Sequence, residues 1–152
     1  MHNSIFQLSA SPIKADDFIS ESSFEPSEID YFADYVSEYE GDLSEVYDNF
    51  PFLVIGTMFT RDGNKLIYQG CNDVFRAWHK GVCQAMEKLS EEGLKDGMNT
   101  WRMGRLLNEP FTSDRFYLGG YCLDSAEFLQ YCANNLKEGD TLYLGGVLDF
   151  HW

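Results

Sequence analysis

The stretch FLVIGTMFT (Phe52–Thr60), followed by RDGN (61–64) and KLIYQ (65–69), is the strongest structural signal in the chain. The first run is rich in β-branched and aromatic residues, and the second run follows a turn that contains glycine. This pattern predicts a β-hairpin. Because the first run is apolar almost throughout, we expect its strand to be central in a sheet.

Shorter patterns on both sides of the hairpin predict further strands and helices. Strands are predicted at 4–10, 116–120 and 141–150. A long amphipathic helix is predicted from Asn72 or Asp73 to Glu92, with Gly93 after it, and another over 125–137, with Asp124 as N-cap. Residues 100–107 fit either a helix or a strand.

These elements predict the α+β class, with a mostly antiparallel sheet of four to five strands and helices packed on one face. The 152 residues are a usual length for one domain, so we expect a single domain over 1–152. Within it, we expect residues 15–50 to form an acidic helical segment docked on a sheet and helix core of residues 51–152.

The tetrapeptide Tyr-Leu-Gly-Gly occurs twice, at 117–120 and at 143–146. Two copies are too few for a repeat protein. We expect two neighbouring strands that each need glycine for a bulge or for close packing.

Charge is distributed very unevenly along the chain. No lysine or arginine lies between Lys14 and Arg61, and this stretch holds twelve of the 25 carboxylates. Residues 1–50 carry a net charge of −11, whereas residues 51–152 carry −3. Such a surface repels nucleic acid and anionic membranes and favours basic partners. A solvated surface that only promotes solubility is the alternative interpretation.

Helical periodicity predicts that the acidic stretch is folded. Ser27 is a candidate N-cap for a helix whose apolar stripe ends at Val36, and residues 43–50 repeat the same spacing. We expect two amphipathic helices with outward carboxylates, among which Asp30, Asp34 and Glu38 follow one another every four residues. The predicted binding residues are Asp30, Tyr31, Asp34, Tyr35, Glu38, Asp42 and Glu45.

The remaining patterns offer little chemistry. The four cysteines form no C-x-x-C motif and no secretory leader is recognisable, so we expect free thiols and a cytoplasmic protein. No phosphate-binding glycine motif occurs, and we expect neither a cofactor nor a metal. Arg102, Arg105 and Arg115 lie close to aromatic residues, and we expect them to pair with the protein's own acids.

The sequence therefore favours a non-enzymatic protein-binding module that acts on a basic or nucleic-acid-binding protein, as an inhibitor, neutraliser or adaptor. Acidic residues spaced like phosphates would make it a nucleic-acid mimic. Direct nucleic-acid binding and membrane binding are not expected. One alternative is a small enzyme that uses Cys and His in an aromatic pocket near His79, since His79 and Cys83 are spaced i, i+4. Another is a structural or assembly subunit.

Overall fold

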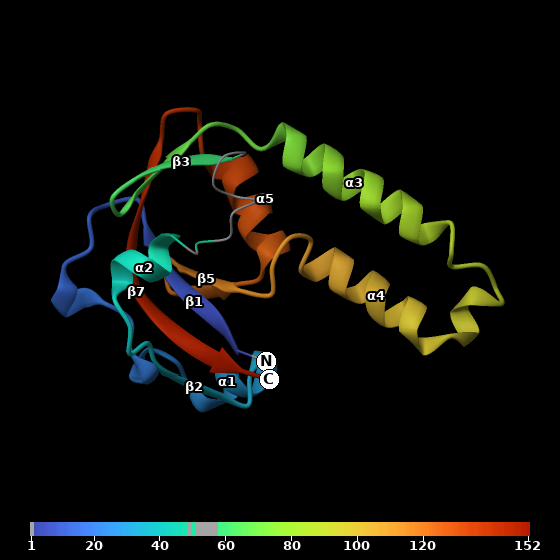
Figure 1. Cartoon of the computed structure of the whole chain (residues 1–152), viewed down its shortest axis with the longest axis horizontal. Coiled ribbons are helices and arrows are strands. Elements are labelled where there is room, and N and C mark those ends of the chain that lie inside the picture. The colour runs from blue at the N-terminus through green and yellow to red at the C-terminus, as the bar shows by residue number, and fades with distance from the viewer. Residues whose placement is uncertain (1, 49, 51–57) are drawn as a thin grey trace.

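A computed structural model, which describes residues 2–48, 50 and 58–152, shows an α+β fold built on a mostly antiparallel sheet (Figure 1). The described strands are β1 (His2–Ser9), β2 (Tyr35–Glu38), β3 (Phe59–Asp62), β4 (Lys65–Tyr68), β5 (Arg115–Leu118), β6 (Tyr121–Leu123) and β7 (Thr141–His151). Their order is β3-β4-β7-β1-β5-β6, and β2 also pairs with β7. The predicted class is confirmed, with seven described strands rather than the four to five predicted.

The long strand β7 lies in the middle of this sheet. One of its edges pairs with β1 in antiparallel fashion along most of its length. Its other edge pairs with β4 near Thr141 and with β2 near His151. On the far side of β1, β5 joins in parallel. Strands from the beginning, the middle and the end of the chain therefore meet around β7.

A bulge in β7 changes which way its side chains face. The register with β1 shifts opposite Gln7, where Gly145 and Gly146 stand. A Cβ atom on Gly145 would lie 2.6 Å from Gln7 Oε1, and one on Gly146 would lie 2.9 Å from Phe18 Cβ. The predicted need for glycine is confirmed at this bulge.

The other glycine pair forms a turn instead of a bulge. Gly119 and Gly120 form the turn between β5 and β6, with φ angles of +62° and +88° that favour glycine. The two tetrapeptides do not lie on neighbouring strands as predicted, because β1 separates β5 from β7.

The two faces of the sheet carry two hydrophobic clusters. The larger one packs α2 (Leu43–Asp48) and α5 (Ser125–Asn135) against the sheet, with the Phe116 and Phe128 rings stacked at 4.2 Å. The smaller one contains Ile5 and the side chains of α1 (Pro26–Phe32) that face the sheet. Because Ile5 and its neighbour Phe6 point to opposite faces, α1 packs on the face opposite to α2 and α5.

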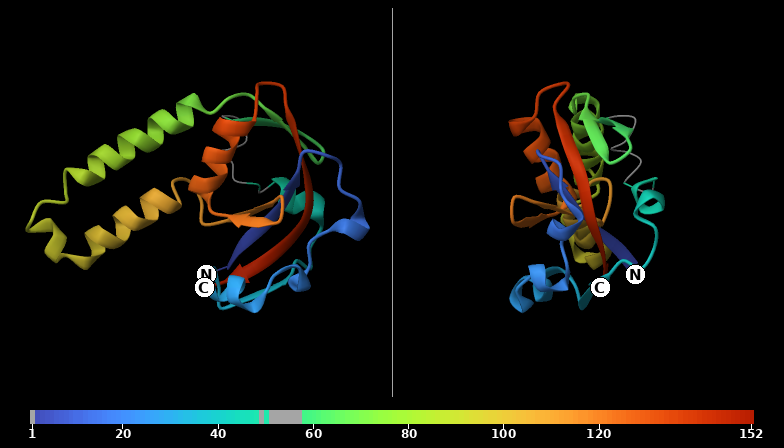
Figure 2. Two further views of the ribbon diagram at one scale, coloured as in Figure 1. Left: turned by 180° about the vertical axis from the view of Figure 1, so that it is seen from behind. Right: turned by 90° about the vertical axis from the view of Figure 1, so that its left-hand side faces the viewer.

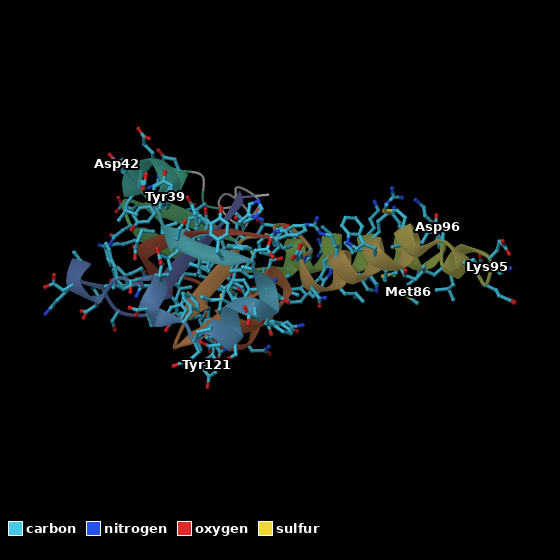
Figure 3. The ribbon with its side chains drawn as sticks, turned by 90° about the horizontal axis from the view of Figure 1, so that it is seen from below. Tyr39, Asp42, Met86, Lys95, Asp96 and Tyr121 are labelled. Carbon is cyan, nitrogen blue, oxygen red and sulfur yellow. The ribbon has the colours of Figure 1, made fainter. Side chains whose placement is uncertain are left out.

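The helices α3 (Asn72–Met86) and α4 (Gly97–Asn108) form an antiparallel pair that projects from the sheet (Figures 1 and 2). We call residues 72–108 the arm. Met86, Lys95 and Asp96 lie towards its far end (Figure 3). Near its base the Trp78 Nε1–H donates to the Leu106 carbonyl at 2.8 Å. No residue of either helix is buried in the described structure.

The predicted boundaries around the arm change in two places. The first helix ends at Met86 instead of Glu92, since the chain turns back through a short 3-10 turn at Gly93–Lys95. The ambiguous residues 100–107 are helical, and Asp96 caps this helix by accepting from the Met98 N–H at 2.9 Å.

The hairpin predicted from the opening stretch exists as β3 and β4, joined by a turn at Gly63 with φ +58°. Its first strand was expected to be central, and this is wrong for the described part, since β3 stands at the end of the strand order. Its apolar Phe59 is buried because it stacks on Phe128 of α5, 6.3 Å away. Residues 51–57, the greater part of the predicted strand, lie outside the described residues. No helix in the described part of the chain is long and apolar enough to cross a membrane.

Candidate functional site: an acidic surface held on the sheet

The acidic segment, residues 15–50, is attached to the sheet at its start by one glutamine. The Gln7 Oε1 accepts from the N–H groups of Gly146 at 2.8 Å and Ile19 at 3.1 Å, and its Nε2–H donates to the Asp17 carbonyl at 2.9 Å. Ile19 and Phe24 are buried in the smaller cluster. The segment is therefore part of the folded domain and not a solvated tail.

The first predicted helix of this segment is shorter than its periodicity indicated. Its N-terminus is a reciprocal capping box between Glu25 and Glu28, with a proline in the first turn. The helix ends at Phe32, and the Asp34 N–H donates to the His151 carbonyl at 2.7 Å. From there the chain continues as β2, because the open edge of β7 satisfies the backbone hydrogen bonds of an extended chain.

This change separates the carboxylates that were predicted to share a helix face. Asp30 is on α1, Asp34 precedes β2, and Glu38 is at the end of β2. Tyr35 and Glu38 are three residues apart on a strand, so they point to opposite faces. The predicted i, i+4 series of acids along one helix is wrong. The structure places Asp30 and Tyr31 together on α1, and Asp42 and Glu45 together at the start of α2.

The second helix of the segment is confirmed as α2. The Ser44 N–H donates to Asp42 Oδ1 at 2.8 Å, and this hydrogen bond lowers the pKa of Asp42. Val46 and Tyr47 are buried, and Phe50 is buried just beyond the helix. The Tyr47 hydroxyl donates to the Gly145 carbonyl, which ties α2 to the bulge in β7. Figure 3 shows Asp42 on the outer side of α2, pointing away from the sheet.

The carboxylates of the segment are exposed and poorly compensated. All twelve are exposed. Within the described structure, Asp48 pairs with Arg61, and Asp34 Oδ2 is 3.8 Å from Nδ1 of His151. Nine others have no basic side chain within 4.0 Å among the described residues: Asp16, Asp17, Glu21, Glu25, Glu28, Asp30, Glu38, Glu40 and Asp42.

Two of these acids come together although both are negative. Glu21 and Glu38 each accept from the other's backbone N–H at 3.3 Å. Neither carboxylate has a basic side chain within 4.0 Å among the described residues, so the negative charge of this pair is not neutralised locally. A basic side chain of a partner could pair with either carboxylate.

Tyrosines of the same segment contribute aromatic surface. Tyr31 is 90% exposed and Tyr35 is 49% exposed. The ring of Tyr35 stacks on His151 at 5.4 Å, which holds it in place without covering it. Tyrosine beside charge is typical of protein interfaces.

A second site, which was not predicted from the sequence, includes Tyr31. It is a pocket of about 260 Å³ between α1, α4, β5 and the end of β7. We call it the arginine–tryptophan pocket after its main lining residues, Tyr31, Trp101, Arg105, Glu109, Arg115 and Trp152. The expectation that these arginines pair with the protein's own acids is confirmed for Arg105 and Arg115.

One signal for this pocket was present in the sequence. Trp101, Arg105 and Glu109 follow one another every four residues, which places them on one side of a helix. The signal depended on reading residues 100–107 as helical. The approach of Tyr31 and Trp152 to this face depends on tertiary structure.

Of the groups considered for catalysis, His79 and Cys83 lie together on the surface of the arm. His79 and Cys83 are exposed on α3, with 3.5 Å between Nε2 and Sγ. Burial raises the pKa of Cys122 to about 12 and also raises that of Cys132, which keeps both as unreactive thiols at neutral pH. All four cysteines are free of disulfides, as predicted. Among the described residues, no group of three or more His, Cys, Asp or Glu side chains could hold a metal ion.

Comparison of the chain with protein-family models, with curated proteins and with solved structures finds no match.

Proposed function

We propose that the protein is a non-enzymatic binding module that uses its acidic segment to bind a basic protein. The observation that supports this most directly is the set of twelve exposed carboxylates in a segment without lysine or arginine. A nucleic-acid-binding protein is the most fitting kind of partner, since its binding surface is complementary to such a charge. The module would act as an inhibitor, neutraliser or adaptor of that partner.

The way the segment is attached supports specific binding. Val36, Val46 and Phe50 are buried, so the backbone that carries the acids is already ordered before a partner arrives. An ordered surface loses less conformational entropy on binding than a flexible tail does. Exposed Tyr31 and Tyr35 would supply contact area beside the charges.

The split arrangement of the acids favours a broad contact over a single helix inserted into a groove. Acids are carried by α1, by β2 and by α2, and Glu21 and Glu38 lie close together between them. In the nucleic-acid mimic version of this proposal, these carboxylates occupy phosphate positions of the partner's usual ligand.

The experiment compares two triple variants with the same change in net charge. One is Asp30→Asn, Asp34→Asn and Glu38→Gln within the acidic segment. The control is Glu87→Gln, Glu91→Gln and Glu138→Gln, three exposed acids outside it. Partners are captured from lysate at low and high salt and identified by mass spectrometry, and affinity for the captured protein is then measured by calorimetry.

We expect the segment variant to weaken binding about tenfold or more, and the control to weaken it far less, because close charges contribute more than distant screened ones. Binding should also fall steeply with salt for the wild type. If both variants lose the same affinity, binding depends on the total charge of the protein and not on the acidic segment. Unchanged binding in the segment variant, with circular dichroism showing an intact fold, would refute the proposal.

A further inference from the structure

The arginine–tryptophan pocket is built from segments far apart in the sequence. Tyr31 comes from α1, Trp101 and Arg105 from α4, Arg115 from β5, and Trp152 follows β7. Tyr31, Trp101 and Trp152 are all exposed, so their rings are accessible from solvent. The pocket thus combines accessible aromatic faces with two guanidinium groups.

Arg105 is held in place by several partners. Its guanidinium carbon lies 5.4 Å from the ring centre of Trp101 and 5.7 Å from that of Trp152. It also forms a salt bridge with Glu109 at 2.7 Å and donates to the Ser113 hydroxyl. These contacts fix its position and hold the two tryptophans around it.

Arg115 is less well satisfied. Its side chain is 17% exposed, and the nearest carboxylate oxygens, of Glu109 and Asp124, are 3.8 and 4.0 Å away, too far for hydrogen bonds. Its Nε–H is buried and has no hydrogen-bond partner among the described residues. A buried guanidinium with unused donor capacity is unfavourable unless another acceptor satisfies it.

The charges of the pocket lining do not cancel. Arg105 and Arg115 are positive, and Glu109 is the single acid among the residues that line it. The side chains of the lining therefore carry one surplus positive charge within a protein whose net charge is −14. A ligand with one negative charge would balance it, whereas a doubly charged phosphate would be repelled by Glu109 and by the rest of the protein.

We propose that this pocket binds a small aromatic carboxylate. The carboxylate would accept hydrogen bonds from the guanidinium groups, whose forked donors match its geometry. The ring would stack on the accessible faces of Trp101, Trp152 and Tyr31. At about 260 Å³ the pocket suits a single-ring ligand, as drug-sized molecules occupy pockets of roughly 300–1,000 Å³. The pocket shares Tyr31 with the surface proposed above to bind a protein. Its test uses a small ligand alone, so the outcome does not depend on that proposal.

The test uses the three tryptophans as reporters. In ¹⁵N-labelled full-length protein, the indole N–H signals of Trp78, Trp101 and Trp152 are followed during titration with benzoate. Benzamide has nearly the same shape without the charge, and phenyl phosphate keeps the ring with a different anion. Trp78 serves as the internal control, because its N–H is already bonded to Leu106 and it lines a different pocket.

We expect benzoate to shift the Trp101 and Trp152 signals saturably while Trp78 stays in place. Benzamide should bind about tenfold more weakly or worse, because it cannot form charge-assisted hydrogen bonds. Arg115→Lys keeps the charge but loses the forked donors, so it should also weaken benzoate binding about tenfold. Arg102→Gln, which changes the neighbour of Trp101 outside the pocket, should bind like the wild type.

Three results would overturn this assignment. Equal binding of benzoate and benzamide would show an apolar site without anion recognition. Tighter binding of phenyl phosphate would show that the ligand is not a carboxylate. No shift of Trp101 and Trp152 at millimolar benzoate would show that the pocket binds no such ligand, and this comparison on the wild type holds even if Arg115→Lys fails to fold.

Discussion

The acidic segment and the arm are both amphipathic, yet one is packed on the sheet and the other projects from it. In the acidic segment, the apolar positions Val46, Tyr47 and Phe50 are buried in the core. In the arm, no residue of the described helices α3 and α4 is buried, and Met86 and Leu94 are more than half exposed. Apolar residues at helical spacing are therefore buried in the acidic segment and only partly buried in the arm.

The difference follows from which face of the sheet is already covered. Helices α2 and α5 occupy the face that carries the larger cluster, and they lie over Phe6 and Phe116. Only the base of the arm, through Val74, Phe75 and Trp78, reaches this cluster. Beyond the base, α3 and α4 have each other as the main partner, and a pair of helices alone cannot bury all of its apolar surface.

Charge separates the two regions as well. The acidic segment has twelve acids and no base, whereas the arm has five acids and six bases. The arm therefore carries a net charge of +1 and the segment −12. The segment offers concentrated negative charge beside the exposed rings of Tyr31 and Tyr35, and the arm offers apolar surface with nearly balanced charge. A partner would recognise the two regions by different physical means.

The largest expected difference between the acidic segment and the arm is in how much a buried or an exposed side chain contributes to the free energy of unfolding. Phe50 is fully buried, with its ring 4.9 Å from that of Phe6 and 5.8 Å from that of Phe116. We expect Phe50→Ala to lower the free energy of unfolding by about 3–5 kcal/mol, through lost burial and the cavity left behind. The matched change in the arm, Leu94→Ala, should lower it by no more than about 0.5 kcal/mol. Urea denaturation measures both, and similar losses would show that the arm is part of the cooperative core.

A second effect concerns local opening. Amides of α3 near Met86 should exchange with solvent much faster than those of β7 at Leu144 and Leu148, which are buried in the middle of the sheet. Exchange in the arm needs only local unfolding of two weakly packed helices, whereas exchange in β7 needs opening of the sheet. Hydrogen exchange followed by mass spectrometry tests this. Equal protection in the two regions would contradict the picture of an independently opening arm.

A third and smaller effect tests how α2 is held. Tyr47→Phe removes the hydrogen bond to the Gly145 carbonyl, which should lower the free energy of unfolding by about 1 kcal/mol at neutral pH. Burial raises the pKa of Tyr47. The unfolded chain therefore ionises first as the pH rises, and the stabilisation is complete below a pH of about 10 and is lost as the pH passes through the folded-state pKa.

The measurement compares urea denaturation of the wild type and Tyr47→Phe at neutral and alkaline pH. The difference in free energy of unfolding between the wild type and Tyr47→Phe should become smaller at alkaline pH. The wild type loses stability there as Tyr47 ionises, and the variant has no hydroxyl at this position to ionise. Other buried groups with raised pKa values, such as Tyr68 and Cys122, are present in both proteins and cancel in the comparison. If this difference in free energy stays the same at neutral and alkaline pH, the pKa of Tyr47 is not higher in the folded protein than in the unfolded chain.

Much of the local structure could be predicted from neighbouring residues. Helix α5 has Asp124 as its N-cap, and Gly139 follows it with φ +92°. The turn of the β3–β4 hairpin falls at Gly63, as its sequence indicated. These signals act over a few residues, so they survive any arrangement of the rest of the chain.

The candidate site was predictable in composition but not in shape. The exposure of Asp30, Tyr31 and Asp42 agrees with the predicted outward side chains. The expected row of Asp30, Asp34 and Glu38 does not exist, because β7 extends beyond β4 and offers its open edge to residues 35–38. Helical spacing in a short stretch cannot reveal that a strand edge elsewhere is available.

The sequence by itself determined the segregation of charge, the α+β class, the Asp124 cap and the Gly63 turn, because these depend on composition and on contacts within a few residues. The N-cap predicted at Ser27 was wrong, since α1 begins after Glu25. Tertiary structure alone decided that β7 would be central, that β2 would replace the end of a helix, and that the arm would stay uncovered. It also brought Tyr31, Trp101 and Trp152 around one pocket. Which element of the chain packs on an apolar face, or pairs with an open strand edge, depends on contacts between residues far apart in the sequence. A pattern within a few residues does not contain that information.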